Sequence, residues 1–386
     1  MSTRGGPGGA GGGRRARRGR ALRRAVLAMA VAGAAGLLLH ALPQAPWRTL
    51  AAAAVAPRAP IAVRIVPAAR AAIDVVWRVD RAANPPCAVA FGPALAEANL
   101  WNVRAAVDGA ACTGSFQTTG TTTGAVAWRY LRGSLTMTAT LQKTDLVAPS
   151  AAVAAYPELI YGWSPFAGIA SRQGAALRFP LTVGRLPGIV LTTEYRVCGA
   201  CLARMNADLA YDVWLSSALR PTWCGSCVPA STVEVMVWLA HTAGVRPVGG
   251  PRPAGALVAK AWLRGAGRWR LGRLDWTTYV CVAGSPACAT HSVVSFVLNG
   301  SREGMPSAYV GLFLRPFLSQ ALAALRRGSG PLHATPLYVN GIELGSEVGP
   351  GSAGHVVDFG SLHFAFSLRR YCLVVVGGKD RRPPAC

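Results

Sequence analysis

One carboxylate, Glu234, interrupts an otherwise apolar run over residues 231–239. A β-strand points alternate side chains to opposite faces. The valines at every second position of this run therefore share one face, and Glu234, Met236 and Trp238 share the other. Because an ionised carboxylate is costly to bury among apolar groups, a Glu in this position either faces solvent or has a chemical task.

Two more carboxylates stand in apolar, aromatic surroundings. Asp212 lies in a strand-like run over residues 208–215, with Trp214 on its face, and Glu347 follows a later strand. Glu343 shares the strand parity of Glu347 and is a rival for its role. Paired carboxylates are typical of glycoside hydrolysis, where one acid protonates the leaving oxygen and the other attacks the anomeric carbon or activates water. Indole faces can stack on sugar rings.

Six motifs along the chain resemble glycoside hydrolase family 12, the endo-β-1,4-glucanases (cellulases) and xyloglucan hydrolases with a β-jelly-roll fold, of archaeal or bacterial type. The most specific piece is the Glu234 run together with the Tyr211-Asp212 strand before it. The sequence departs from the family at Ser346, where the family has Thr. The resemblance covers roughly residues 85–376, and its motifs are Asn99-Leu100-Trp101, 156–162, 205–214, 234–239, 295–297 and Gly345-Ser346-Glu347.

The resemblance implies a role for each matched carboxylate. Glu234 is the expected nucleophile, Glu347 the expected acid/base, and Asp212 the carboxylate that assists beside the nucleophile. Family members retain the anomeric configuration by double displacement and need no metal or other cofactor. The two Glu must then lie ~5–5.5 Å apart, and Glu347 needs a raised pKa to hold its proton near neutral pH. The residues expected to bind substrate are Asn99, Trp101, Trp163, Trp214, Met236 and Trp238.

Most of these residues also have a structural interpretation. Glu234 could be a solvent-facing strand residue, and Asp212 could be a buried hydrogen-bond acceptor. Trp101, Trp163 and Trp238 could each belong to the core. The spacing alone leaves these alternatives open.

Short strand-like runs separated by Gly and Pro dominate the chain after residue 75. This pattern predicts an all-β fold, a two-sheet β-jelly-roll sandwich of concanavalin-like type, over residues 76–380, with the substrate cleft on its concave face. One helix is expected within residues 305–327, at least over its second half, as a lid or an edge cover. The expected strands are 75–79, 87–91, 127–131, 156–163, 177–183, 188–197, 208–215, 231–239, 257–263, 269–282, 291–298, 336–344 and 363–376.

The chain of 386 residues has a net charge of +24, which invites a nucleic-acid interpretation. Eight Arg and no acid lie in residues 1–24, so +16 remains for the rest. No nucleic-acid-binding motif accompanies the charge, and a solvated basic surface is the expected reading.

The N-terminus has the pattern of a targeting segment. Residues 1–24 are rich in Arg and Gly and read as a cytoplasmic tail or the basic region of a signal. Residues 25–42 contain no Asp, Glu, Lys or Arg and predict a signal peptide or a membrane anchor. Residues 43–75, rich in Ala and Pro, read as a linker. We therefore expect an extracellular or cell-surface protein, membrane-anchored if the segment is not cleaved.

Ten cysteines all follow this apolar segment, and an even number in an exported chain favours disulfides. Zinc is the alternative, because Cys198, Cys201, Cys224 and Cys227 form two C-x-x-C pairs. Pairing each cysteine with its neighbour predicts the disulfides 87–112, 198–201, 224–227, 281–288 and 372–386.

These observations predict a monomeric, retaining endo-acting enzyme whose partner is a β-glucan polysaccharide, either cellulose or a soluble β-glucan. Two alternatives remain. A xyloglucan-specific endoglucanase would differ in the loops beside the cleft. A non-catalytic carbohydrate-binding sandwich would keep the tryptophans but would not need the two opposed glutamates.

Overall fold

The chain divides after Ala56, and every residue described below belongs to the second unit, Pro57–Cys386. The computed structural model describes residues 61–65, 73–81, 85–104, 120–131, 134–142, 146, 153–164, 168–198, 206–221, 231–242, 245–248, 253–288, 290–299, 305, 307–327, 336–349 and 362–376. The predicted signal or anchor over residues 25–42 lies outside this part. Within the described residues, no helix is both long enough and apolar enough to cross a membrane.

The first layer of the fold is a sheet that carries the predicted site. Its strands are antiparallel to their neighbours except for the parallel pair β12–β15. Three short strands extend it, β8 (Ile169–Ala170), β9 (Leu181–Thr182) and β18 (Val348–Gly349). In spatial order the main strands are β3 (Ala88–Phe91), β4 (Ala94–Glu97), β7 (Glu158–Ser164), β17 (Tyr338–Gly345), β11 (Asn206–Ser216), β12 (Val233–His241), β15 (Ser292–Leu298), β14 (Arg268–Cys281) and β13 (Gly255–Gly265).

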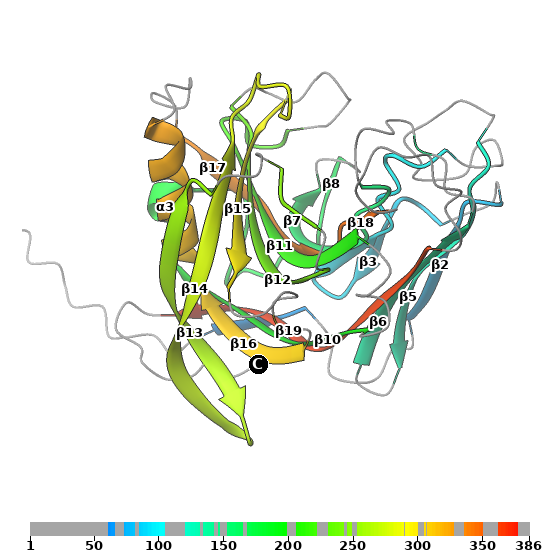
Figure 1. Cartoon of the computed structure of the whole chain (residues 1–386). Helices are drawn as coiled ribbons and strands as arrows, with labels where there is room; N and C mark the ends of the chain where they lie inside the picture. Colours follow the sequence, from blue (N-terminus) through cyan, green and yellow to red (C-terminus); the bar gives the residue numbers. More distant parts are fainter. Residues whose placement is uncertain are drawn as a thin grey trace, which may run out of the picture. The chain divides into compact units, whose positions relative to one another are not determined.

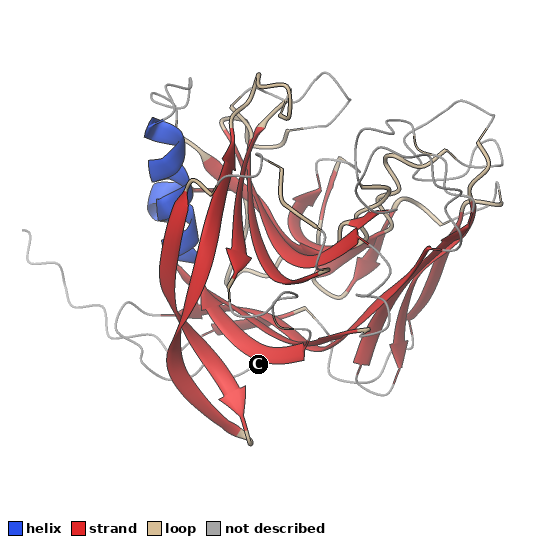
Figure 2. Cartoon of the chain, viewed as in Figure 1, coloured by secondary structure: helices blue, strands red, loops and turns tan. Residues whose placement is uncertain are grey.

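The second layer lies against the core side of the first, and the two layers can be followed in Figures 1 and 2. Strand β13 pairs with β14 in the first layer and with β16 in the second, so it links them. The strands of the second layer, in spatial order, are β2 (Ile73–Arg78), β5 (Thr123–Leu131), β6 (Ser134–Gln142), β19 (Leu362–Val376), β10 (Gly188–Val197) and β16 (Ser307–Phe313), with β1 (Ile61–Arg64) also paired to β19.

The core fills the space between the layers as the period of two predicted. Val233, Val235 and Val237 are fully buried on the core face of β12. Tyr211 of β11, expected in the core from its parity, is also fully buried, and its ring centroid lies 6.0 Å from that of Tyr371 in β19. The prediction of an all-β, two-sheet sandwich is therefore confirmed.

One helix, α3 (Leu314–Arg327), follows β16 and contacts β10, β12 and β13. Its apolar face buries Phe317, whose ring packs edge-on against Trp276 at 5.1 Å and Phe296 at 5.2 Å. The helix predicted over the second half of 305–327 is thus confirmed, and it covers the core. The first half is instead β16, because its alternating apolar residues pair with both β10 and β13.

Three further segments differ from the sequence predictions. The strand expected over 177–183 is present only as β9, and residues 183–185 form a 3₁₀ turn. Strand β6, Thr-rich and alternating, was not predicted. Residues 61–64, assigned to the linker, form β1, because their backbone completes pairing along the C-terminal half of β19.

The predicted disulfide between Cys281 and Cys288 is present at the end of β14. Cys87, Cys198 and Cys372 are also disulfide-bonded. Their predicted partners, and the pair 224–227, lie outside the described residues. Cys198 is therefore not free to bind zinc, and no cluster of three or more His, Cys, Asp or Glu in the described ranges could hold a metal ion.

Candidate active site

Seven of the chain's 16 acidic residues gather on the first layer, on the face opposite the core. The strand register aligns them: Glu97 pairs with Glu158, Glu343 pairs with Asp212, and Trp214 pairs with Glu234. We call this set the carboxylate row. Its members are Glu97, Glu158, Asp208, Asp212, Glu234, Glu343 and Glu347.

The predicted nucleophile Glu234 lies on β12 and is hydrogen-bonded to a histidine. Its Oε2 lies 3.0 Å from Nε2 of His291, and only 13% of the Glu234 side chain and 16% of the His291 side chain are exposed. The ring of Trp214 lies 5.6 Å from the imidazole. Glu234 is therefore neither a solvated surface residue nor an unpaired buried charge.

The predicted acid/base Glu347 lies between β17 and β18 and is held by Asp208 of β11. The backbone N–H of Glu347 donates to Oδ1 of Asp208 at 3.0 Å, and the N–H of Asp208 donates to the carbonyl of Glu347 at 3.2 Å. The hydroxyl of Ser346 also donates to the carbonyl of Asp208. Three hydrogen bonds thus fix the segment that carries Glu347.

A glycine makes this approach possible. A Cβ at Gly345 would lie 2.7 Å from Cβ of Glu158 and 2.8 Å from the carbonyl oxygen of Pro157. These separations are too short for any side chain, so only glycine lets the end of β17 pack this closely on β7. This accounts for glycine as the first residue of the Gly345-Ser346-Glu347 motif.

Burial and mutual repulsion keep protons on this pair. Burial, followed by the charge of Glu234, raises the pKa of Glu347 to about 7. Burial and the neighbouring Glu347 raise the pKa of Asp208 well above its usual range, so Asp208 stays protonated. Glu347 can therefore hold a proton near neutral pH, which is the state that an acid catalyst needs.

Asp212, predicted as the assisting carboxylate, is almost fully buried on β11, and its Oδ1 has no hydrogen-bond partner. Burial raises its pKa well above the usual range, and the charges of Glu234 and Glu343 raise it further. Asp212 is thus a neutral acid beside Glu234, since two adjacent carboxylates do not both ionise readily.

The remaining acids, Glu97, Glu158 and Glu343, lie on the neighbouring strands β4, β7 and β17 toward the sheet edge. The indole N–H of Trp214 donates to Oε2 of Glu343 at 2.6 Å, and the Asn99 amide donates to Oε1 of Glu158 at 2.9 Å. Burial raises the pKa of Glu343 to about 7 and that of Glu97 to about 8. The pKa of Glu158 is raised well above its usual range by burial and by Glu343. Each of these three carboxyl groups therefore holds its proton to a higher pH than an exposed carboxyl group does.

Four of the predicted substrate-binding residues, Asn99, Trp214, Met236 and Trp238, are buried. Asn99 has a φ of 38°, which takes it out of the predicted strand, and its amide is used by Glu158. Met236 and Trp238 share the face of Glu234 as predicted, but they are 2% and 1% exposed and pack with Cys281 and Cys288. We correct the prediction for these four, because burial leaves them no surface on which a sugar could stack.

The other two predicted substrate-binding residues are Trp101 and Trp163. Trp101 is 40% exposed, and Trp163 is partly exposed, with Arg220 over its ring at 5.7 Å and its N–H bonded to the carbonyl of Pro221 at 2.6 Å. Trp214 lies beside Asp212 as its parity predicted, but it is 4% exposed and is engaged with Glu343. Trp101 and Trp163 therefore keep aromatic surface available for a ligand.

Sequence reasoning missed four members of this site. Asp208 shares the strand and the parity of Asp212, so the period of two could have identified it. Glu158 and Glu97 lie within or beside motifs that were recognised, and only the strand register shows that they face each other. His291 has no sequence signal, because a lone histidine gives no sign of its partner 57 positions away.

No protein-family model and no curated protein sequence matches this chain. Solved structures do match this chain, with low sequence identity and with TM-scores below 0.5. They are family 12 glycoside hydrolases. A metagenome-derived endoglucanase of this family is 17% identical, with coverage of 80% of this chain and 100% of its own and a TM-score of 0.48. The xyloglucanase from Bacillus licheniformis is 17% identical (78% and 99% covered, TM-score 0.47), and endoglucanase 3 from Trichoderma harzianum is 18% identical (81% and 100%, 0.46). The family suggested by the sequence motifs is therefore also the family of these structures.

Proposed function

We propose that this chain is a retaining endo-β-1,4-glucanase that cleaves cellulose or soluble β-glucans by double displacement. The observation that carries the proposal is the contrast between two carboxylates on one face of the sheet. Glu234 is hydrogen-bonded to His291, whereas burial and the charge of Glu234 raise the pKa of Glu347 to about 7, so that Glu347 keeps its proton near neutral pH. A retaining glycosidase needs one ionised and one protonated carboxyl group at the scissile bond.

In the first step, a carboxylate oxygen of Glu234 forms a bond to the anomeric carbon while the glycosidic C–O bond breaks. Glu347 gives its proton to the departing oxygen, so the leaving sugar departs as an alcohol. In the second step, the ionised Glu347 takes a proton from water, the water oxygen attacks the anomeric carbon, and Glu234 is released. Two inversions give net retention of configuration.

The other site residues support this sequence. Asp208 accepts a hydrogen bond from the backbone N–H of Glu347 and so fixes the segment that carries the acid/base. The neutral Asp212 places no second negative charge beside Glu234. Trp101 and Trp163 offer exposed ring surface on which sugar rings could stack.

The test is reducing-sugar release from carboxymethylcellulose, barley β-glucan and xyloglucan by the wild type, Glu234→Gln and Glu347→Gln. We expect release by the wild type and loss of release in both variants, with oligosaccharide binding retained in Glu234→Gln. Asp275→Asn, an exposed acid on β14, is the matched control and should stay active. Release from xyloglucan alone would make the enzyme xyloglucan-specific. Binding without release from any glucan would support the non-catalytic sandwich.

We also propose that the protein acts outside the cell or at its surface, anchored through residues 25–42 if they are not cleaved. The basic stretch before an apolar segment and the confirmed Cys281–Cys288 disulfide both suit an exported protein. Fractionation of the native cells with an antibody against the second unit would distinguish the membrane-anchored form from the released one.

A further inference from the structure

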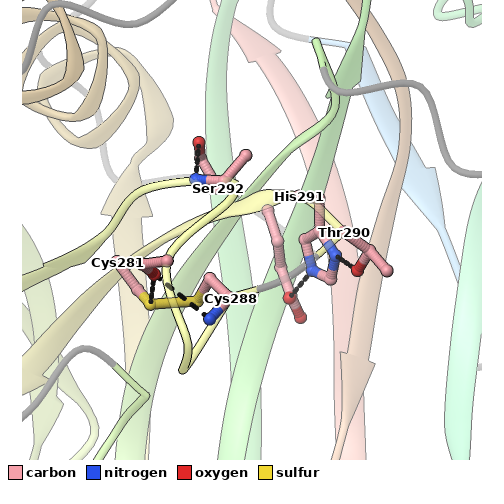
Figure 3. Close-up of a disulfide and its surroundings, with 8 residues drawn as sticks. Cys281, Cys288, Thr290, His291 and Ser292 are labelled. Carbon is pink, nitrogen blue, oxygen red and sulfur yellow. Dashed lines mark hydrogen bonds and ion pairs between the residues drawn. A yellow bond between two sulfur atoms is a disulfide. The ribbon is translucent and has the colours of Figure 1, made fainter.

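His291 is the basic group at the nucleophile, and both of its ring nitrogens have partners. Nε2 faces Oε2 of Glu234 at 3.0 Å, and Nδ1 lies 2.9 Å from the hydroxyl of Thr290. Figure 3 shows the imidazole of His291 beside the hydroxyl of Thr290. An ionised carboxylate only accepts hydrogen bonds, so Nε2–H is the donor. With both nitrogens engaged and the ring of Trp214 beside it, the imidazole has a fixed orientation.

Among the described residues, the other titratable groups that interact with Glu234 are four acids. Its charge raises the pKa of Asp212 and Asp208 on β11, of Glu343 on β17 and of Glu347 beyond β17. Within the described residues, no second base is hydrogen-bonded to Glu234. Glu234 therefore has four acids on the side of β11 and β17, and one histidine on the side of β15.

The segment that carries His291 is anchored on both sides. Upstream, the Cys281–Cys288 disulfide closes the turn between β14 and β15, and the N–H of Gly284 donates to the carbonyl of Cys288 at 2.8 Å. Downstream, the N–H of Ser292 donates to the carbonyl of Thr232 at 3.1 Å, next to the start of β12. His291 therefore lies three positions after a covalent cross-link and one position before a strand paired to the strand of Glu234.

The disulfide also packs onto the face of the nucleophile. Cys281 and Cys288 contact the buried cluster that contains Met236 and Trp238, the two residues that follow Glu234 on the same face of β12. The turn thus lies over β12 and presents His291 to the first residue of that face.

We propose that His291 is a positioning residue for the nucleophile, and that the Cys281–Cys288 disulfide holds it in place. The imidazole binds Oε2 of Glu234 and so leaves Oε1 as the oxygen that bonds to the anomeric carbon. A carboxylate held by one oxygen loses the rotational freedom that would otherwise oppose attack. The inference rests on the proposed function, in which Glu234 is the nucleophile.

The test compares His291→Leu with His291→Gln. Leu keeps apolar volume beside Trp214 but removes the donor, whereas the Gln side-chain amide restores a donor near the position of Nε2. The substrate is 2,4-dinitrophenyl β-cellobioside, whose leaving group departs without acid catalysis. Rapid release of dinitrophenol under single-turnover conditions therefore reports the attack by Glu234 alone.

We expect His291→Leu to slow this step on the order of 100-fold, as misplacement of a reacting group does, with KM unchanged. His291→Gln should recover most of the loss. Equal rates in the wild type and His291→Leu would overturn the inference, and so would equal losses in the Leu and Gln variants. A wild type that hydrolyses no β-glucoside would instead refute the proposed function, and the inference with it.

The role of the disulfide is tested by Cys281→Ser/Cys288→Ser in the wild-type and His291→Leu backgrounds. We expect the double Ser variant to slow dinitrophenol release in the wild-type background and to have no further effect once His291 is Leu. The same fold-loss in both backgrounds would show that the disulfide acts independently of His291. Circular dichroism of each variant at the assay temperature verifies that the protein is folded.

Discussion

The burial of Glu97, Glu158 and Glu343 leads to a specific prediction for the dependence of stability on pH. Glu343 is fully buried, and its pKa rises from the ordinary value of 4.5 to about 7 in the folded protein. Between these two values the folded state binds a proton that the unfolded chain has lost. Stability must therefore fall as the pH rises from about 4.5 through 7.

Glu343→Gln removes this dependence because an amide is neutral at every pH. One pKa unit corresponds to about 1.4 kcal/mol, so ionising Glu343 in the folded state costs ~3 kcal/mol. The variant should match the wild type near pH 5, where both side chains are neutral. At pH 8 it should be more stable than the wild type by ~3 kcal/mol, since the Gln carbonyl can still accept from Trp214.

The assay is urea unfolding followed by far-ultraviolet circular dichroism at pH 5, 6, 7 and 8, with disulfides intact. The fluorescence of Trp214 is avoided because its indole contacts the mutated group. Asp275→Asn, exposed on β14, is the control and should show the pH slope of the wild type. If Glu343→Gln and the wild type gave parallel stability curves, the buried, protonated state assigned to Glu343 would be wrong.

Three other predictions follow from the described contacts. Trp214→Phe removes the hydrogen-bond donor to Glu343 and should destabilise the protein by about 1–3 kcal/mol. The loss should be largest above pH 7, where Glu343 is ionised, and urea unfolding at pH 5 and pH 8 measures it. An equal loss of stability at both pH values would contradict the role assigned to the charge of Glu343. The kcat/KM of the wild type should fall above a pH of about 7, because Glu347 loses its proton there. Glu347→Gln should abolish polysaccharide cleavage but leave the rapid release of dinitrophenol intact. A Glu347→Gln variant that still degrades polysaccharide would exclude Glu347 as the acid. Phe317→Ala on α3 empties a site between Trp276 and Phe296 and should cost about 3–5 kcal/mol in the free energy of unfolding; a loss below 1 kcal/mol would show that α3 does not seal the core.

The sequence was sufficient to predict the fold class and the strands that carry the candidate site. The period of two in β12 separated its buried valines from Glu234, and the same rule put Trp214 with Asp212 and Tyr211 in the core. Prediction from the sequence failed where tertiary contacts determine the secondary structure. Residues 307–313 could continue a helix by composition, but two neighbouring strands pair with them.

The site was only partly predictable for a related reason. Parity shows which face a side chain points to, but not whether another segment covers that face. Met236 and Trp238 were on the predicted face, and the Cys281–Cys288 turn packs over them. The pairing of Glu97 with Glu158 depends on strand register, and that of His291 with Glu234 depends on a parallel strand pair; neither is visible in local spacing.

The central claim is that Glu234 forms a covalent bond to the sugar. It is tested most directly by inactivating the wild type with 2,4-dinitrophenyl 2-deoxy-2-fluoro-β-cellobioside, followed by peptide mapping with mass spectrometry. The account predicts one fluorocellobiosyl group, attached to the peptide that contains Glu234 and to no other carboxylate. A label on Asp212, Glu343 or Glu347, or an active enzyme that remains unlabelled and releases products of inverted configuration, would contradict it.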